Sequence, residues 1–120
     1  DALGSKNNLG SSDKKTYQID FRNSNEALKE SLEDINEGAD IVMVKPAGYY
    51  LDIVKELKNH IPVPISAYQV SGEYSMIKNL KYDNANIYKD TVMESIYCIK
   101  RAGADIIFSY FSKEVAEWLR

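Results

Sequence analysis

GADIVMVK, residues 38–45, sets the architecture of this chain, because a glycine suited to ending a helix precedes a short apolar run that ends in a lysine. The Gly-Ala-Asp triplet recurs at residues 103–105, ahead of IIFSY. Counting seven residues on from each glycine reaches Lys45 in the first unit and Tyr110 in the second. A third run, PISAYQVS, ends on Ser71. The carboxyl ends of parallel strands share one edge of a sheet, so we expect these three residues at that edge.

Apolar residues at helical spacing separate the three runs. The predicted helices span residues 24–37, 49–59, 73–79 and 87–101, and a last one begins at Ser112. The predicted strands span residues 40–46, 64–70 and 104–110. The first strand contains a continuous apolar run, which is typical of a strand covered by helices on both faces. This alternation of helix and strand predicts an α/β fold with a parallel sheet and right-handed crossovers.

Three strands cannot close a barrel, because eight β/α units need roughly 250 residues. The 120-residue chain is therefore either a small open α/β domain or the last three β/α units of a TIM (β/α)8 barrel. The final helix is typical of a carboxyl terminus, whereas the polar residues 1–15 do not look like the start of a protein. We expect residues 1–15 to form a disordered terminus or an active-site lid, and residues 16–120 to form the β/α units.

Composition excludes several classes of function. The net charge is −3 and no basic stripe is visible, which argues against a nucleic-acid partner. No apolar run approaches the ~18 residues that a membrane helix needs. The single cysteine, Cys98, rules out an internal disulfide and fits a reducing, cytosol-like compartment. With one cysteine and one histidine, the chain is poorly equipped to bind zinc alone.

Lys45 is the strongest candidate for chemistry. An ammonium at the end of a buried strand loses hydration, which lowers its pKa and frees the amine to attack a carbonyl carbon. The product of that attack is a Schiff base. The alternative is a lysine whose stem lies along the strand end while its ammonium reaches water.

Ser71 and Tyr110 also have two interpretations each. Ser71 at a strand-to-helix turn can offer its hydroxyl and nearby N–H groups to an anion, or it can cap the helix that follows. Tyr110 can offer a phenol at the sheet edge, or it can be a core aromatic with a satisfied hydroxyl.

Three longer motifs, MVKPA (residues 43–47), YQVSGEY (68–74) and KRAGAD (100–105), carry a family resemblance. With them the chain resembles, from residue 1 to 120, the C-terminal part of porphobilinogen synthases, also called 5-aminolevulinate dehydratases. The resemblance implies a (β/α) barrel enzyme that condenses two 5-aminolevulinate molecules into porphobilinogen, with loss of two waters, in haem and tetrapyrrole biosynthesis. It also implies a homo-octamer in the cytoplasm or an organelle matrix.

By position in the motifs, the resemblance assigns roles to individual residues. It implies that Lys45 forms the Schiff base with one substrate, whose carboxylate Ser71 and Tyr110 would hold. Gln18 would bind the second substrate's carboxylate, and residues 1–15 would be the active-site lid. Glu30 matches a carboxylate that holds an allosteric magnesium ion through water in many bacterial members.

The chain also departs from the family pattern. The family's second Schiff-base lysine and the segment that decides an active-site zinc lie upstream of these residues, so the active-site metal stays open. Lys14 stands where the lid often has an arginine, and a lysine keeps the charge but loses the bidentate fork to a carboxylate. The upstream lysine's absence predicts that the chain alone is inactive.

Two other interpretations remain open. One is a class I aldolase-like barrel, which also uses a lysine at a strand end. The other is a catalytically inactive piece that is poorly stable or self-associates, because three strands leave a sheet edge and an apolar face uncovered.

Overall fold

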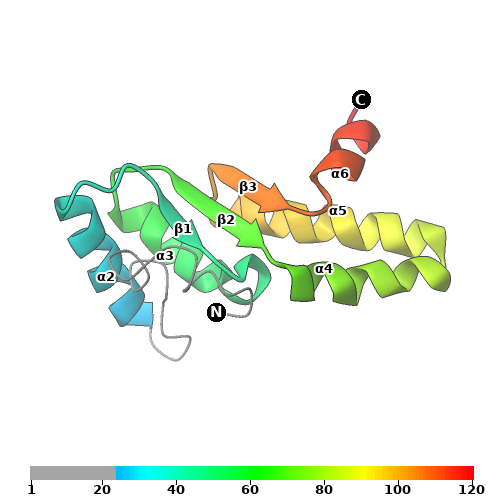
Figure 1. Cartoon of the computed structure of the whole chain (residues 1–120), viewed down its shortest axis with the longest axis horizontal. Coiled ribbons are helices and arrows are strands. Elements are labelled where there is room, and N and C mark those ends of the chain that lie inside the picture. The colour runs from blue at the N-terminus through cyan, green and yellow to red at the C-terminus, as the bar shows by residue number, and fades with distance from the viewer. Residues whose placement is uncertain (1–23) are drawn as a thin grey trace.

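The computed structural model describes residues 24–120, and in them helices and strands alternate as the sequence predicts (Figure 1). The strands are β1 (Val42–Val44), β2 (Ile65–Gln69) and β3 (Ile106–Ser109). The helices are α2 (Ser24–Asn36), α3 (Leu51–His60), α4 (Ser71–Lys78), α5 (Ala85–Ala102) and α6 (Ser112–Trp118). Two short 3₁₀ helices are η2 (Ala47–Tyr49) and η3 (Asn79–Tyr82).

The strands form one parallel sheet in the order β1-β2-β3. Val44 pairs with Ala67, and Ala67 pairs with Ile107, so the three strands end at nearly the same level. The parallel arrangement predicted from the alternation of helix and strand is therefore confirmed. Each strand is shorter than its predicted range, and all three end just before the residues singled out for chemistry.

Positive-φ glycines end the two helices that lead into β1 and β3. Gly38 has a φ of 106° and follows α2, and Gly103 has a φ of 126° and follows α5. The Gly38 N–H donates to the carbonyl of Ile35, and the Gly103 N–H donates to the carbonyl of Lys100. Both close the last turn with a conformation that side chains with a Cβ rarely adopt. The repeated Gly-Ala-Asp triplet thus marks the same helix-to-strand turn twice.

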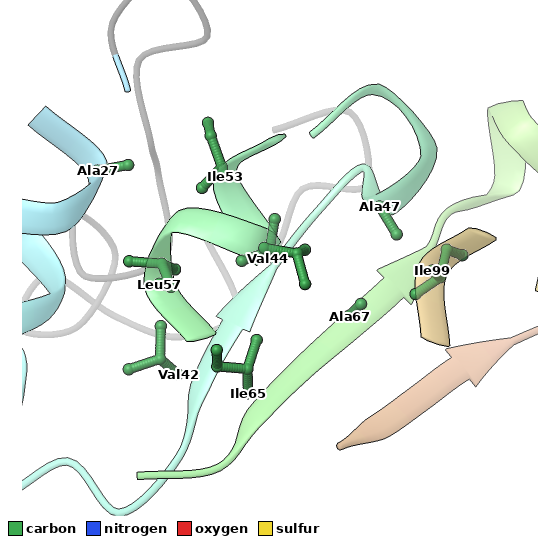
Figure 2. Close-up of a cluster of buried hydrophobic side chains, with 10 residues drawn as sticks. Ala27, Val42, Val44, Ala47, Ile53, Leu57, Ile65, Ala67 and Ile99 are labelled. Atoms are coloured by element: carbon green, nitrogen blue, oxygen red, sulfur yellow. The ribbon is translucent and has the colours of Figure 1, made fainter. Parts of the chain in front are cut away.

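The main core lies between the sheet and its helical layer. Figure 2 shows Ile53 and Leu57 of α3 beside Val42 and Val44 of β1, with Ile65 of β2 next to them. The buried members of this cluster are Ala27, Val42, Val44, Ala47, Ile53, Val54, Leu57, Ile65, Ala67 and Ile99. They come from α2, η2, α3, α5 and the first two strands, so residues far apart in sequence pack together and hold the sheet in place.

Helices cover only one face of the sheet in the part of the chain that the structure describes, so the expectation of helices on both faces is wrong there. α3 and α5 pack on one face (Figure 1). On the other face Phe108 is 48% exposed and Ile106 is 38% exposed. This arrangement agrees with the barrel that the resemblance implies, since the second face of a barrel sheet is covered by the side chains of other strands rather than by helices.

A second, smaller cluster ties the C-terminal helix to the rest. Phe111 and Val115 pack against Tyr88 and Val92 of α5. The Tyr88 hydroxyl lies 2.9 and 3.0 Å from the two carboxylate oxygens of Glu114. This cluster fixes the chain directly after β3, where Tyr110 lies. No helix within residues 24–120 is long and apolar enough to cross a membrane.

Candidate functional site

The three residues singled out from the sequence lie at the carboxyl edge of the sheet. Lys45 directly follows β1, Tyr110 directly follows β3, and Ser71 is the first residue of α4, two positions after β2 ends. Because the strands are parallel and neighbouring, this edge is shared. The predicted juxtaposition of strand ends is confirmed, and the chemical roles of these residues remain predictions.

A hollow of about 380 Å³ lies over the face of the sheet that the helices leave open. Its lining residues are Met43, Tyr68, Phe108, Ser109 and Tyr110. The strand alternation explains why Tyr68 and Phe108 both belong to the set, because they are register partners on adjacent strands. Lys45 lies two residues beyond Met43 and is half-buried. The hollow therefore adjoins the point where the candidate amine emerges from β1.

Tyr110 is not a core aromatic, so that interpretation of the residue is wrong. Its side chain is 53% exposed, and its hydroxyl accepts a hydrogen bond of 3.2 Å from the Tyr68 hydroxyl. The centroid of the Tyr74 ring lies 5.4 Å from that of the Tyr110 ring, and the two rings pack in a tilted arrangement. The hydrogen bond to Tyr110 is the main reason that the pKa of Tyr68 is raised, with burial as the second cause. The raised pKa keeps the Tyr68 phenol protonated at neutral pH, so Tyr68 acts as a hydrogen-bond donor.

Ser71 does not cap the helix that follows it. The N-cap of α4 is Val70, and Ser71 is the first helical residue. The carboxylate of Glu73 takes the capping role instead and accepts a hydrogen bond of 2.8 Å from the Val70 N–H. The Ser71 hydroxyl is thus not required by the helix end, which leaves the anion-binding interpretation of this residue as the surviving prediction.

A chain of hydrogen bonds beneath the edge orients β3 on β2. The Phe111 N–H donates to the Ser109 hydroxyl at 3.0 Å, and Ser109 donates to Gln69 Oε1 at 2.6 Å. Gln69 Nε2 in turn donates to Ser95 Oγ at 2.9 Å. Gln69 is 1% exposed, so this is a satisfied buried network that holds the backbone on both sides of Tyr110.

Sequence reasoning missed three residues that the structure brings to this edge: Tyr68, Gln69 and Glu73. Tyr68 could have been found, because strand alternation places it on the same face as its register partner Phe108. Gln69 lies on the helix-covered face, where an amide is unexpected without knowledge of Ser95 and Ser109. The sequence offered only a weak signal for Glu73, since a capping pair normally has serine or threonine three residues earlier and this chain has Val70.

Other predicted site residues cannot be placed in this arrangement. Gln18, Lys14 and the lid segment 1–15 lie outside the described residues. Glu30 lies on α2, where its side chain is half-buried. Within residues 24–120, no group of three or more His, Cys, Asp or Glu side chains is arranged to hold a metal ion.

Comparison with known proteins gives a consistent result over nearly the whole chain. The family model of delta-aminolevulinic acid dehydratase matches residues 1–118. The delta-aminolevulinic acid dehydratase of Helicobacter pylori is 54% identical over 108 residues, which are 90% of this chain and 33% of that protein. The Escherichia coli protein of the same name is 55% identical over 105 residues, 88% of this chain and 32% of that protein.

A plant relative and a solved structure agree with these matches. The chloroplastic delta-aminolevulinic acid dehydratase of Physcomitrium patens is 50% identical over 119 residues, which are 99% of this chain and 27% of that protein. The crystal structure of delta-aminolevulinic acid dehydratase (porphobilinogen synthase) from Toxoplasma gondii, in complex with the reaction product porphobilinogen, superposes with a TM-score of 0.80. It is 45% identical and covers 92% of this chain and 31% of its own.

These comparisons also set the scale of the chain. It spans about a third of the length of the two bacterial relatives. The likeness to the solved structure confirms the fold class inferred from the sequence, a parallel α/β portion of a (β/α) barrel. With a family model that matches residues 1–118, this chain belongs to the delta-aminolevulinic acid dehydratase family.

Proposed function

We propose that this chain supplies a Schiff-base lysine and carboxylate-binding hydroxyls to a porphobilinogen synthase, a lyase that condenses two 5-aminolevulinate molecules. The observation that carries the proposal is the position of Lys45, directly after β1 and two residues beyond Met43, which lines a hollow together with Tyr68 and Tyr110. A ketone carbon in that hollow and the amine of Lys45 would be the two partners that imine formation requires.

The chemistry follows from that arrangement. The neutral amine of Lys45 attacks the ketone carbon of one substrate and water leaves, which gives an imine. The carbon next to the imine then loses a proton more readily. Formation of one carbon–carbon and one carbon–nitrogen bond to the second substrate closes the pyrrole ring, and two waters are released overall. Holding both substrates in register supplies much of the rate, because effective molarities can be very large.

The hydroxyl groups at the edge would hold the carboxylate of the substrate bound to Lys45. Tyr110 and Ser71 carry this assignment, and the hydrogen bond from Tyr68 orients the Tyr110 oxygen. Gln18, together with Lys14 from the lid, is proposed to bind the second substrate's carboxylate. The second Schiff-base lysine would come from elsewhere in the full protein, so residues 1–120 alone are expected to be inactive in turnover.

Metal binding is assigned only in part. Magnesium keeps several of its water ligands and often uses one or two carboxylates, so a half-buried Glu30 on α2 fits a water-mediated site away from the sheet edge. The ion would supply positive charge that stabilises packing near α2 and takes no part in bond formation. The ligands of an active-site zinc are not assigned to this chain. We also propose a homo-octamer located in the cytoplasm or an organelle matrix.

A hybrid enzyme tests the proposal. In it, residues 1–120 replace the matching third of the Escherichia coli relative, and Lys45→Arg provides the control. The hybrid enzyme is incubated with 5-aminolevulinate, reduced with borohydride, and analysed by peptide mass spectrometry. We expect a reduced adduct on Lys45 and formation of porphobilinogen, with both lost in Lys45→Arg. A folded hybrid enzyme that forms no adduct on Lys45 contradicts the proposal, and adducts with sugar phosphates instead would favour an aldolase.

A further inference from the structure

Glu73 joins two loops that are far apart in the sequence. Its Oε2 accepts a hydrogen bond of 2.8 Å from the Val70 N–H, and its Oε1 accepts one of 2.7 Å from the Gly48 N–H. The side chain is only 6% exposed. Burying a carboxylate is costly, so a carboxylate kept in this place needs partners that offset the cost.

Helix capping explains only half of this arrangement. Glu73 is the third residue of α4, where a carboxylate accepts from the N-cap N–H and interacts favourably with the helix dipole. The bond to Gly48 adds nothing to that cap, because it spans 25 residues and ends on η2. The Gly48 N–H lies in the first turn of η2, where N–H groups lack partners within the helix. One carboxylate therefore satisfies donors from both loops.

The two loops are the ones that carry the proposed substrate-binding groups. Gly48 lies three residues after Lys45, and Val70 directly precedes Ser71. We propose that Glu73 is a positioning residue. It fixes the loop after β1 to the turn after β2, so that Lys45 and Ser71 can contact the same substrate molecule. The catalytic meaning of this inference rests on the proposed function, whereas the joining of the two loops by Glu73 is independent of it.

The absence of a side chain at Gly48 leaves room for this carboxylate. A Cβ built at Gly48 would lie 2.6 Å from Glu73 Oε1, closer than non-bonded atoms allow. The carboxylate has little room to yield, because it is buried and its other oxygen is bonded to Val70. Burial raises the pKa of Glu73, and hydrogen bonds from the backbone of Val70, Gly48 and Ala47 partly oppose that rise. Glycine is thus needed here for close approach.

The first test measures the joining of the loops without any catalysis. Amide hydrogen exchange is followed by mass spectrometry of short peptides that contain Gly48 or Val70, in the hybrid enzyme and in its Glu73→Gln variant. Glutamine has the same shape but replaces one acceptor oxygen with a donor, so one of the two N–H groups loses its partner. We expect exchange at Gly48 or Val70 to be roughly tenfold faster, relative to other amides. Unchanged exchange at both amides overturns the inference.

The second test measures positioning. In the hybrid enzyme, borohydride trapping at Lys45 is followed per folded molecule, together with kcat and KM, for Glu73→Gln, Glu73→Asp and Gly48→Ala. We expect the rate of trapping and kcat to fall by about 10- to 100-fold, because small misplacements of reacting groups cause losses of this size. Aspartate should not rescue, since its shorter side chain keeps the charge but cannot reach both loops. Glu94→Gln is the matched control. Glu94 is an exposed residue of α5 that lines, together with Glu73, a cavity of roughly 320 Å³.

Each outcome has a distinct meaning. Slow trapping in the Glu73 and Gly48 variants with a normal Glu94→Gln supports the positioning role. Less-than-additive losses in the Glu73→Gln, Gly48→Ala double variant support it further, because both changes break the same bond. Normal trapping at Lys45 in folded variants overturns the role and leaves the proposed function intact. Failure of the unaltered hybrid enzyme to form any adduct overturns the proposed function, and the catalytic meaning of Glu73 with it.

Discussion

The hydroxyl of Tyr68 donates a hydrogen bond of 3.2 Å to the hydroxyl of Tyr110, across the carboxyl ends of β2 and β3. The two residues are 42 positions apart, and their rings are 6.4 Å apart between centroids. Both rings line the hollow on the open face of the sheet. The pair thus presents two linked phenols at the sheet edge that β1 and Lys45 share.

Tyr110→Phe should weaken substrate binding in the hybrid enzyme. The change removes one hydroxyl that we assign to the substrate carboxylate, and loss of a hydrogen bond to a charged group costs about 1.5–3 kcal/mol. We expect KM for 5-aminolevulinate to rise by about 10- to 100-fold with a smaller change in kcat. The same variant should lower the pKa of Tyr68, whose main raising influence is the bond to Tyr110. Steady-state kinetics and ultraviolet titration measure the two effects, and an unchanged KM contradicts the assignment.

Gln69→Leu should destabilise the protein by about 1–3 kcal/mol, because it leaves the partly buried Ser109 hydroxyl without its acceptor. The variant should also disturb the backbone at Phe111, whose N–H depends on Ser109. Urea denaturation of the hybrid enzyme measures the change. The Gln69→Leu, Ser109→Ala double variant is the control, since removing both partners should cost less than the sum of the single changes.

The two positive-φ glycines should respond differently to alanine. Gly38→Ala adds a Cβ that meets no atom within 4 Å, so only backbone strain of about 1 kcal/mol is expected. Gly103→Ala places its Cβ 2.7 Å from Lys58 Cγ in addition to the same strain. We therefore expect the larger loss of stability at Gly103. Equal urea midpoints for the two variants would show that Lys58 moves aside without cost.

Acid should weaken the contact between the starts of β2 and β3. Asp105 accepts from Lys58 Nζ at 2.8 Å and from the Ile65 N–H at 2.9 Å, and these bonds lower the pKa of Asp105. A lowered pKa in the folded state means that the stabilisation is present above the unfolded-state pKa and is lost as the pH falls through the folded-state pKa. Asp105→Asn should make the stability less dependent on pH in the acid range. Melting temperatures measured across that pH range test this expectation.

The 120-residue chain by itself should associate with other copies. Ile41, Phe108 and Tyr110 are 49%, 48% and 53% exposed, and Phe108 and Tyr110 lie at the hollow on the open face of the sheet. Exposed apolar patches of this kind mark surfaces that become covered. We expect concentration-dependent elution in sizing chromatography. A sharp monomer peak with a cooperative melting transition would contradict this expectation and favour an independent open α/β domain.

The order of the elements, the helix ends at Gly38 and Gly103, and the strand ends at Lys45 and Tyr110 were all readable from the sequence. They depend on local properties: the period of the apolar residues, the backbone freedom of glycine, and the regular spacing between them. The three longer motifs also indicated the family by resemblance. The exact strand lengths were not readable, because a strand ends where pairing with its neighbour ends rather than where the apolar run ends.

Only the tertiary structure decided which side chains meet at the sheet edge. Glu73 with Gly48, Gln69 with Ser109, and Tyr68 with Tyr110 are separated by 25, 40 and 42 residues. Each pair forms because a parallel sheet brings distant strand ends together, and no local pattern records which partner lies across the edge. The sequence alone therefore determined the candidate amine, and the packing of neighbouring strands and loops determined the groups that surround and position it.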